Sequence, residues 1–336
     1  MRVWRISSPG NLEALAPREE PEKRPGPGEV RVRMRAASLN YRDLMVVEGR
    51  YGRAAVPPDL VPLSDGAGEV LQAGPGVTRF KTGDRVAGTF FQGWICGDIT
   101  PADHAAALGG AIDGVLAEER IFPEDGLVAV PAHLGFEEAA TLPCAALTAW
   151  NALFTDRPLR PGETVLTLGT GGVSTFAVQF AHAAGARVIV TSSSDAKLER
   201  MRALGASETI NYRLHPEWEK EVWRLSGGVG VDHVVELGGA GTLPRSIASA
   251  RLGGAVHLIG VLTGGEIEPS VILRRSVTVR GIFVGSRRMF EAMDRMIAFS
   301  GLHPVIDRVF AFADAPDAYR HLKAAAHIGK VVIRIP

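Results

Sequence analysis

In the middle of the chain, two kinds of hydrophobic stretch alternate with each other. Short apolar runs alternate with stretches in which apolar residues recur every three or four positions, which is the pattern of buried strands separated by amphipathic helices. Strands are predicted at residues 164–168, 187–191, 231–237, 255–261 and 276–284, and helices at 195–204 and 242–250. Because strands and helices alternate in this way in α/β folds, we predict a doubly wound parallel sheet of about six strands.

The first 130 residues have a different pattern. Their apolar and polar residues alternate in short runs at 28–40, 66–77 and 83–88, and most of the 21 prolines of the chain fall at or before Pro161. Proline is excluded from central strands and from helix interiors. The composition therefore predicts short strands and turns that form a mainly antiparallel, barrel-like domain.

The two patterns divide the chain into two predicted domains. Residues 1–130 and 285–336 form the mainly β domain, to which a helix at 287–300 and a closing strand at 330–335 return. Residues 131–284 form the α/β domain.

Composition and charge restrict the possible partners. The 336 residues include 46% hydrophobic ones and carry a formal net charge of zero, so we expect no nucleic-acid or anionic-membrane partner. No apolar stretch approaches the ~18 residues of a membrane span, and the first ten residues lack a signal-like apolar core, so a cytoplasmic location is expected. Two cysteines, Cys96 and Cys144, cannot form a disulfide framework and are expected to be reduced.

A glycine-rich turn follows the first predicted strand of the α/β domain and precedes a helix. In the sequence GTGGVS, Gly169 permits a tight turn, Gly171 permits close approach of the backbone to a pyrophosphate, and Ser174 stands at the third position of the fingerprint. Because the N–H groups at a helix start and the helix dipole attract anions, this segment predicts a dinucleotide-phosphate cradle.

The residues after the second predicted strand bear on the choice of dinucleotide. NAD-binding units usually carry an acidic residue about 20 residues past the glycines, whereas Ser192 and Ser193 stand here. With no carboxylate to repel a 2′-phosphate, and with Lys197 and Tyr212 as nearby donors, NADPH is favoured over NADH. In the alternative interpretation, the serines only cap the next helix and Asp195 accepts the ribose.

Several segments resemble the medium-chain dehydrogenase/reductase superfamily and, within it, the zinc-free quinone oxidoreductase-like branch. They are SLNYRDL at 38–44, GAGEV at 66–70, GDRV at 83–86, LPCAALTAWNAL at 142–153, GTGGVS at 169–174 and GKVV at 329–332. The resemblance implies a GroES-like (chaperonin-10-like) catalytic domain, a Rossmann domain, and nicotinamide and substrate held between them. It also implies a homodimer joined at the last Rossmann strand, 276–284 in this chain.

The resemblance also identifies departures from the zinc-dependent members of the superfamily. Asn40 stands where their first cysteine ligand would be, Ser64 and Asp65 replace their His-Glu pair, and only Cys144 remains. Because a catalytic zinc needs about three protein ligands, we expect no metal.

Two candidate catalytic residues are carried over from the resemblance. Tyr51 has the spacing from Asn40 at which enoyl-thioester reductases of the superfamily carry a proton-donating tyrosine; it is either that donor or a wall of the pocket. Asn40 is expected to orient the substrate carbonyl or the nicotinamide ribose. Asp43 is expected to fix the loop, since a carboxylate cannot stabilise an enolate.

The resemblance assigns a larger set of residues to the cofactor, in addition to Asn40, Ser192, Ser193, Lys197 and Tyr212. They are Gly171, Gly172 and Val173 at the pyrophosphate and nicotinamide, Thr148 at the nicotinamide, Lys330 near the phosphates, Gly238, Gly260 and Val261 at strand ends, and Val284, which together with Phe283 and Trp94 shapes the pocket.

The expected function is hydride transfer from NADPH to a small-molecule electrophile, either a quinone or an α,β-unsaturated carbonyl, without zinc. Two alternatives stay open. One is an alcohol or carbonyl dehydrogenase of the same superfamily, and the other is an NADPH-binding regulator that has lost turnover.

Overall fold

The computed structural model describes residues 1–52 and 56–336, which divide into two compact units. The first unit comprises Met1–Leu147 and Val284–Pro336, and the second comprises Thr148–Phe283. Residues 131–147, which the sequence analysis placed in the α/β domain, group here with the first unit.

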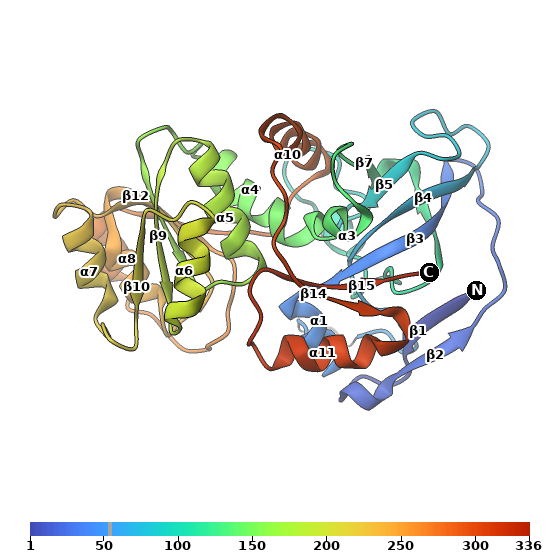
Figure 1. The fold of residues 1–336 in the computed structure, drawn as a ribbon, viewed down its shortest axis with the longest axis horizontal. Coiled ribbons are helices and arrows are strands. Elements are labelled where there is room, and N and C mark those ends of the chain that lie inside the picture. The colour runs from blue at the N-terminus through green and yellow to red at the C-terminus, as the bar shows by residue number, and fades with distance from the viewer. Residues whose placement is uncertain (53–55) are drawn as a thin grey trace. The chain divides into compact units, whose positions relative to one another are not determined.

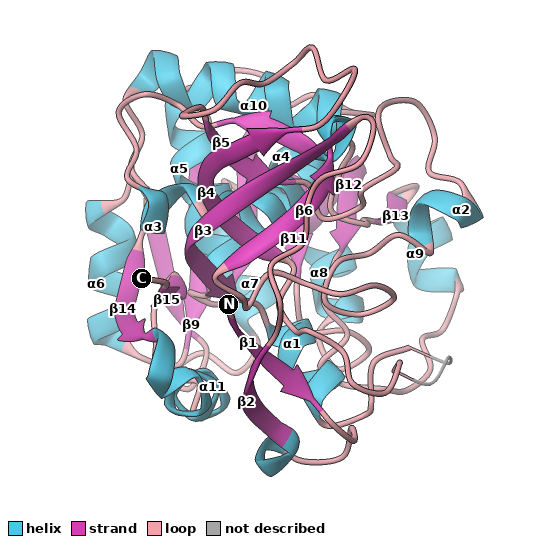
Figure 2. Cartoon of the chain, turned by 90° about the vertical axis from the view of Figure 1, so that its right-hand side faces the viewer, coloured by secondary structure: helices cyan, strands magenta, loops and turns pink. Residues whose placement is uncertain are grey.

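The first unit contains a main sheet and a separate two-stranded sheet. Its strands are β1 (Arg2–Ile6), β2 (Leu15–Glu19), β3 (Glu29–Leu39), β4 (Asp65–Ala73), β5 (Arg85–Gly88), β6 (Glu119–Pro123), β7 (Leu127–Ala129), β14 (Ile306–Ala311) and β15 (Lys330–Arg334). The main sheet runs in the order β14-β15-β3-β4-β5-β7, with β6 paired to β3, while β1 pairs with β2. Figure 2 shows β3 with β4 and β5, and β1 beside β2. All of these pairings except β14 with β15 are antiparallel, which confirms the predicted mainly antiparallel domain.

The helices of the first unit are short, with one exception. They are α1 (Tyr41–Val47), α2 (Pro101–His104), α3 (Phe136–Ala139), α10 (Arg287–Ser300) and α11 (Ala315–Lys323), together with a π-helical turn at Leu142–Ala146 and 3-10 turns at Leu12–Ala14, Glu124–Gly126 and Phe312–Asp314. The bounds of α10 match the predicted helix because Ser286 caps its first turn and Gly301, with φ of 61°, ends it.

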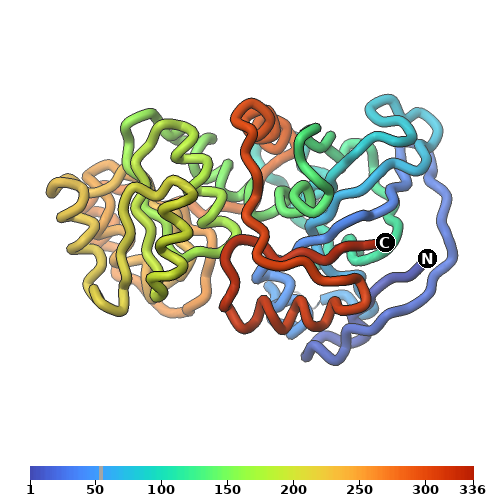
Figure 3. The backbone as a smooth tube through the Cα atoms, viewed as in Figure 1, coloured from blue at the N-terminus to red at the C-terminus, as the bar shows by residue number. Residues whose placement is uncertain are grey.

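The closing strand β15 returns to the first unit, as predicted. It lies between β14 and β3, and Val331 pairs with Leu39 across the β15–β3 ladder. Figure 3 shows this C-terminal segment beside the early segment that contains β3. Alternating apolar residues of β3, including Val32 and Met34, enter the same core as Val331 and the buried Tyr319 of α11. Residues near both ends of the sequence therefore share one core.

The second unit is built on a six-stranded parallel sheet, as predicted. Its strands are β8 (Thr164–Leu168), β9 (Arg187–Ser192), β10 (Glu208–Asn211), β11 (Val231–Glu236), β12 (Ala250–Leu258) and β13 (Thr278–Gly281), in the order β10-β9-β8-β11-β12-β13. The last strand is shorter than the predicted strand at 276–284, and that prediction was wrong at both ends. Ser276, with φ of 49°, ends the preceding helix, and the positive φ of 34° at Val284 is incompatible with an extended strand.

Helices cover both faces of this sheet (Figure 1). The helices from this part of the chain are α4 (Leu147–Phe154), α5 (Gly172–Ala183), α6 (Asp195–Ala203), α7 (Trp218–Leu225), α8 (Leu243–Ser249) and α9 (Ser270–Arg275), and α5 to α9 pack on the strands. Leu166, Val234 and Val256 of the strands pack with Ile247 of α8 in a core from which water is excluded. Within residues 1–52 and 56–336, no helix has both the length and the apolar character needed to span a membrane.

Candidate active site

The order of the parallel sheet reverses between two adjacent strands, β8 and β11. In open α/β sheets, ligands bind beyond the carboxyl ends of the strands at such a reversal. The segments that leave these ends are the glycine turn after Leu168 and the loop after Glu236. The topology therefore places the predicted cradle at the expected end of the sheet.

The glycine turn has the backbone geometry that the sequence predicted. Gly169 has φ of 76°, a left-handed conformation, and its N–H donates to Thr191 O at 2.8 Å. Gly171 precedes α5 as its N-cap, and no side chain caps the helix there. A Cβ atom added to Gly171 would meet no atom within 4 Å. The first turn of α5 thus presents backbone N–H groups below open space, which fits an anion such as pyrophosphate.

Ser174, which replaces the third glycine of the fingerprint, tethers the helix to the strand. Its hydroxyl donates to Leu168 O at 2.8 Å, at the carboxyl end of β8, and its side chain is fully buried. The hydrogen bond holds α5 close to the sheet, which is the role that the third glycine fulfils through its small size. Gly172 and Val173 form the start of this helix.

The residues assigned to the adenosine end lie where β9 and β10 terminate. Ser192 is the last residue of β9, its carbonyl accepts from Tyr212 N at 3.0 Å, and Lys197 lies in the first turn of α6. The ring of Tyr212 is half-exposed. Asp195 accepts a 2.7 Å hydrogen bond from Asn211 Nδ2, so its carboxylate already has a local partner. The structure therefore groups the sequence-predicted serine, lysine and tyrosine at one edge, and Ser193 lies between β9 and α6.

A residue that the sequence analysis missed organises the loop after β11. Glu236 is fully buried, and its carboxylate accepts from Gly238 N at 2.6 Å, Gly239 N at 3.1 Å and Thr242 Oγ1 at 2.6 Å, and also from Ser246 Oγ. These bonds compensate the burial of its charge and fix the path of residues 237–242. The signal available in the sequence was an acidic residue that ends an apolar run and is followed by Leu-Gly-Gly.

The loops after β11 and β12 are joined directly. Thr263 N donates to Gly238 O at 2.9 Å, and Ala240 N donates to Thr263 O at 3.1 Å. Gly260 has no room for a side chain, because an added Cβ would lie 2.2 Å from Leu237 O, whereas Val261 is exposed. The predicted residues Gly238, Gly260 and Val261 thus lie on neighbouring loops at the carboxyl edge of the sheet.

In the first unit, five residues from four separate segments form a polar cluster, of which Ser64, Asp65 and Lys330 are fully buried and the other two are partly buried. We call Asn40, Ser64, Asp65, Cys144 and Lys330 the polar cluster. Lys330 Nζ donates to Asn40 Oδ1 at 2.5 Å and to the preceding carbonyl, Leu39 O, at 2.7 Å, and lies 3.6 Å from Asp65 Oδ2. Asp65 also accepts from Ser64 Oγ at 2.6 Å and from Cys144 N at 3.2 Å.

Local backbone structure aims these side chains at one another. Gly329, with φ of 72°, turns the chain into β15 so that Lys330, its first residue, is only 2% exposed. Asn40 precedes α1 but makes no side-chain cap bond, which leaves its amide for Lys330. Cys144 lies in the π-helical turn, a distortion often found at functional sites.

Burial dominates the electrostatics of the polar cluster. Burial raises the pKa of Asp65, and the Lys330 ammonium, the Asn40 side chain and the Ser64 hydroxyl oppose this effect. Burial and the charge of Asp65 raise the pKa of the Cys144 thiol, so Cys144 stays protonated at neutral pH. Cys144 and Cys96 are both free cysteines in the structure.

The polar cluster does not suit a zinc ion. Its donors are an amide oxygen, a hydroxyl, one carboxylate and a protonated thiol, and an ammonium group contacts Asn40 and lies beside Asp65. Zinc prefers thiolates and neutral imidazoles and would be repelled by the adjacent ammonium. Among the described residues, no three His, Cys, Asp or Glu side chains are grouped so that they could hold a metal ion.

The second candidate catalytic residue, Tyr51, lies against a buried arginine. The Arg42 guanidinium is 4.5 Å from the centre of the Tyr51 ring and donates to Leu108 O at 2.8 Å and to Asp43 Oδ1 at 3.2 Å. Asp43 accepts from Asn40 N at 2.8 Å, which agrees with the expectation that it fixes this loop. Burial raises the pKa of Asp43 to about 6, against the opposing charge of Arg42.

Two further predicted residues have informative environments. Thr148 is buried in α4. Val284 is buried and has φ of 34°, which a β-branched residue rarely adopts. Strained backbone of this kind is found preferentially at functional sites, and sequence reasoning had no signal for it.

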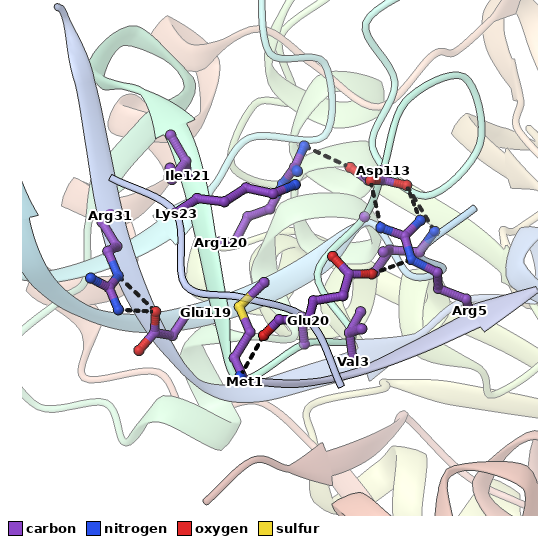
Figure 4. Close-up of a pocket in the computed structure, with 13 residues that line it drawn as sticks. Met1, Val3, Arg5, Glu20, Lys23, Arg31, Asp113, Glu119, Arg120 and Ile121 are labelled. Atoms are coloured by element: carbon purple, nitrogen blue, oxygen red, sulfur yellow. Dashed lines mark hydrogen bonds and ion pairs between the residues drawn. The ribbon is translucent and has the colours of Figure 1, made fainter. Parts of the chain in front are cut away.

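A cavity of about 50 Å³ lies beside the two-stranded sheet of the first unit, and it is not a candidate for the active site (Figure 4). All three acidic side chains of its lining are already paired: Arg5 pairs with Glu20 and Asp113, and Arg31 pairs with Glu119. The predicted site residues are all absent from its lining.

Comparison with known proteins identifies both units. A model described as the alcohol dehydrogenase GroES-like domain matches residues 26–132, and a model described as zinc-binding dehydrogenase matches residues 172–298. The first match confirms the GroES-like part of the predicted fold, and the parallel sheet confirms its Rossmann part.

Individual relatives align over nearly the whole chain. A zinc-type alcohol dehydrogenase-like protein of Schizosaccharomyces pombe is 47% identical over 335 residues, which are 96% of each chain. A quinone oxidoreductase of Pseudomonas aeruginosa is 32% identical and also covers 96% of each chain. A solved structure from Sinorhizobium meliloti, described as that of an alcohol dehydrogenase, has a TM-score of 0.92 and 42% identity, with 99% of this chain and 98% of that chain covered.

Proposed function

Because the chain belongs to the medium-chain dehydrogenase/reductase superfamily, we propose that it is an NADPH-dependent oxidoreductase that transfers hydride to a quinone or an α,β-unsaturated carbonyl without zinc. The observation that carries this proposal is the polar cluster, in which a lysine ammonium contacts Asn40 and lies beside Asp65. A site of this chemistry stabilises negative charge by hydrogen bonding and fixed charge rather than by metal coordination. Conjugated carbonyls and quinones, which spread the charge over several atoms, suit such a site.

The open space above Gly171 and the uncapped start of α5 fit a dinucleotide pyrophosphate. Gly171, Gly172 and Val173 would hold it, and Gly238, Gly260 and Val261 border the same edge of the sheet. When bound, the nicotinamide supplies the hydride. The protein's own contribution is to bind and orient the reactants.

We assign the proton and charge chemistry to the first unit. The Asn40 amide orients an acceptor oxygen or the ribose, and the Tyr51 hydroxyl, on a ring held by the Arg42 guanidinium, donates a proton to the reduced acceptor. Asp43 supports both by fixing the start of α1. Thr148 and the strained Val284 are proposed to contact the nicotinamide.

NADPH is proposed over NADH because Ser192 and Ser193 follow β9 where an acidic residue would exclude a 2′-phosphate. Lys197, at the start of α6, and the half-exposed Tyr212 are the proposed donors. The engagement of Asp195 by Asn211 supports this choice over ribose binding by Asp195.

The test of the proposed function is a screen of NADPH oxidation with quinones, enones, enoyl thioesters, aldehydes and ketones. The proposal predicts turnover with a quinone or a conjugated carbonyl. Turnover with simple alcohols or aldehydes alone would favour the second candidate, an alcohol or carbonyl dehydrogenase, which the names of the relatives from S. pombe and S. meliloti favour. Tight NADPH binding with no turnover in any class would favour a non-catalytic regulator.

We also propose a homodimer through the segment 276–284, in the cytoplasm. β13 is the edge strand of its sheet, and Leu273 and Phe283 beside it are exposed. Pairing with a second copy would cover this edge. Light scattering after size-exclusion chromatography tests the proposal, which predicts about twice the mass of 35.8 kDa.

A further inference from the structure

Lys330 is buried to an extent that is unusual for a lysine. Its side chain is 2% exposed, and its ammonium group has three oxygen atoms around it: Leu39 O at 2.7 Å, Asn40 Oδ1 at 2.5 Å and Asp65 Oδ2 at 3.6 Å. Lysine side chains are almost never fully buried unless they are paired. Two of these contacts are hydrogen bonds, to Leu39 O and Asn40 Oδ1, and the third, to Asp65, is an ion pair.

These contacts disfavour a phosphate-binding role for Lys330. A phosphate ligand would have to replace Asn40 or Asp65 and draw the ammonium out of the interior. Asp65 is itself fully buried, so removal of its cation would leave an uncompensated charge. The ammonium group of Lys330 instead contacts Asn40 and lies beside Asp65, both in its own unit.

The contact with Asn40 has a defined consequence for the orientation of the amide. An amide group has one accepting end and one donating end, and the ammonium group, which only donates, fixes Oδ1 on its own side. Nδ2 must then lie on the opposite side of the group. Asn40 makes no helix-cap bond with its side chain, so the two charged groups of the polar cluster set this orientation: Lys330 contacts Oδ1, and the amide stabilises the Asp65 carboxylate.

We propose that Lys330 is a positioning residue: its ammonium group serves as the internal cation of the polar cluster, neutralising Asp65 and fixing the orientation of the Asn40 amide, and it does not bind cofactor phosphate. The part of this inference that concerns Asn40 in turnover rests on the proposed function. The part that concerns the pairing with Asp65 does not.

The experiment compares Lys330→Met with Asn40→Ala, with the double variant of the two, and with Lys323→Met. Lys323 is an exposed lysine of the same unit that pairs with Glu48 and provides the matched control. Turnover with the best acceptor of the screen and NADPH affinity are measured separately. We expect Lys330→Met to lower kcat at least about tenfold, to change the Kd for NADPH less than about twofold, and to add nothing to the loss in Asn40→Ala.

Two results in this arm would overturn the inference. A large rise in the Kd for NADPH with unchanged kcat would identify Lys330 as a phosphate ligand. Fully additive effects of Lys330→Met and Asn40→Ala would show that the lysine does not act through the amide.

A second arm measures thermal stability. It needs no substrate and remains informative if Lys330→Met folds poorly. Lys330→Met should lower Tm by about 5 °C or more because Asp65 loses its cation, and the double variant Lys330→Met/Asp65→Asn should regain at least half of this loss. If the added Asp65→Asn gives no recovery, the pairing is wrong. Inactivity of the native enzyme with every acceptor would refute the proposed function and leave this arm intact.

Discussion

The dinucleotide cradle and the polar cluster are built in opposite ways. The cradle in the second unit is made of backbone: Gly169 turns the chain, Gly171 leaves open space, and the start of α5 offers N–H groups, all within a few consecutive residues. The polar cluster in the first unit is made of side chains from distant segments, and its central hydrogen bond joins Lys330 and Asn40, 290 positions apart.

This difference determines how each part can fail. The cradle binds through backbone N–H groups and needs the open space above Gly171. A side chain added at that position should therefore block the ligand. A cluster of buried charges depends on partners, so the loss of one group leaves another unsatisfied. We therefore expect the cradle in the second unit to be sensitive to added side chains, and the polar cluster in the first unit to be sensitive to the loss of any one of its charged groups.

The largest effect is expected for Gly171→Val. A Cβ at this position meets nothing in the protein and Gly171 does not have a positive φ, so the fold should be unaffected. The new side chain would occupy the space proposed for pyrophosphate, and NADPH affinity should fall more than about 100-fold, as titration by fluorescence would measure. The control is Gly135→Val, at an exposed glycine of the first unit where an added Cβ would make only ordinary contacts, at 3.6 Å and 3.7 Å, with glutamate side chains. Unchanged NADPH affinity in Gly171→Val would show that the pyrophosphate does not bind above Gly171.

Tyr51→Phe tests the side-chain part of the site. Loss of a general acid lowers turnover by about 100-fold or more, and the ring stays in place against Arg42, so NADPH affinity should not change. Steady-state kinetics would be compared with Tyr41→Phe, which alters an exposed tyrosine of the same unit. Undiminished turnover in Tyr51→Phe would make this residue a pocket wall.

A buried polar pair in the second unit allows a test by pH. His233 Nδ1 and His257 Nε2 are 3.0 Å apart, and burial, with the charges of His233, Arg280 and Arg157, lowers the pKa of His257 from 6.5 to about 3. The unfolded chain therefore takes up a proton below pH 6.5 that the folded chain refuses, so stability is complete above pH 6.5 and is lost as the pH falls.

The expected loss from His257 between pH 6.5 and pH 5 is about 2 kcal/mol, and His257→Gln should abolish most of it. Urea unfolding at the two pH values measures the effect, with the exposed His215→Gln as the control. An equal loss in the native protein and in His257→Gln would show that this histidine is not the source.

The smallest effect is expected for Lys197→Ala. Removal of one charge-assisted contact to a 2′-phosphate should weaken NADPH binding about tenfold and leave NADH binding unchanged. Lys220→Ala, which removes an exposed lysine of α7, controls for the general effect of charge. If Lys197→Ala weakens the binding of NADPH and NADH equally, Lys197 is not the residue that distinguishes the two cofactors.

The success of sequence reasoning follows the same division. The parallel strands and the glycine turn were predictable because their signals are local: apolar runs, turn residues and a helix start. The last strand was predicted too long because the conformations of Ser276 and Val284 depend on their surroundings and have no local signature. The cap-like hydrogen bonds of Glu236 were missed for a related reason, since an acid at the end of a buried run is usually read as a boundary.

The polar cluster lay beyond sequence reasoning for a physical reason. Asn40, Asp65 and Cys144 could be singled out by resemblance, but the role of Lys330 depends on the pairing of β15 with β3, which closes the chain on itself. The resemblance suggested a phosphate contact for Lys330, and only the buried geometry of its ammonium group points to a different role.

The central claim is that hydride leaves the nicotinamide for a conjugated acceptor without assistance from a metal. Its most direct test uses NADPH deuterated at C4 and a protein sample whose zinc content is measured. We expect deuterium on the β-carbon of the saturated carbonyl product, the carbon that was electrophilic in the enone, while zinc stays far below one ion per chain. Turnover that appears only with stoichiometric zinc, or a product without the label, would contradict it.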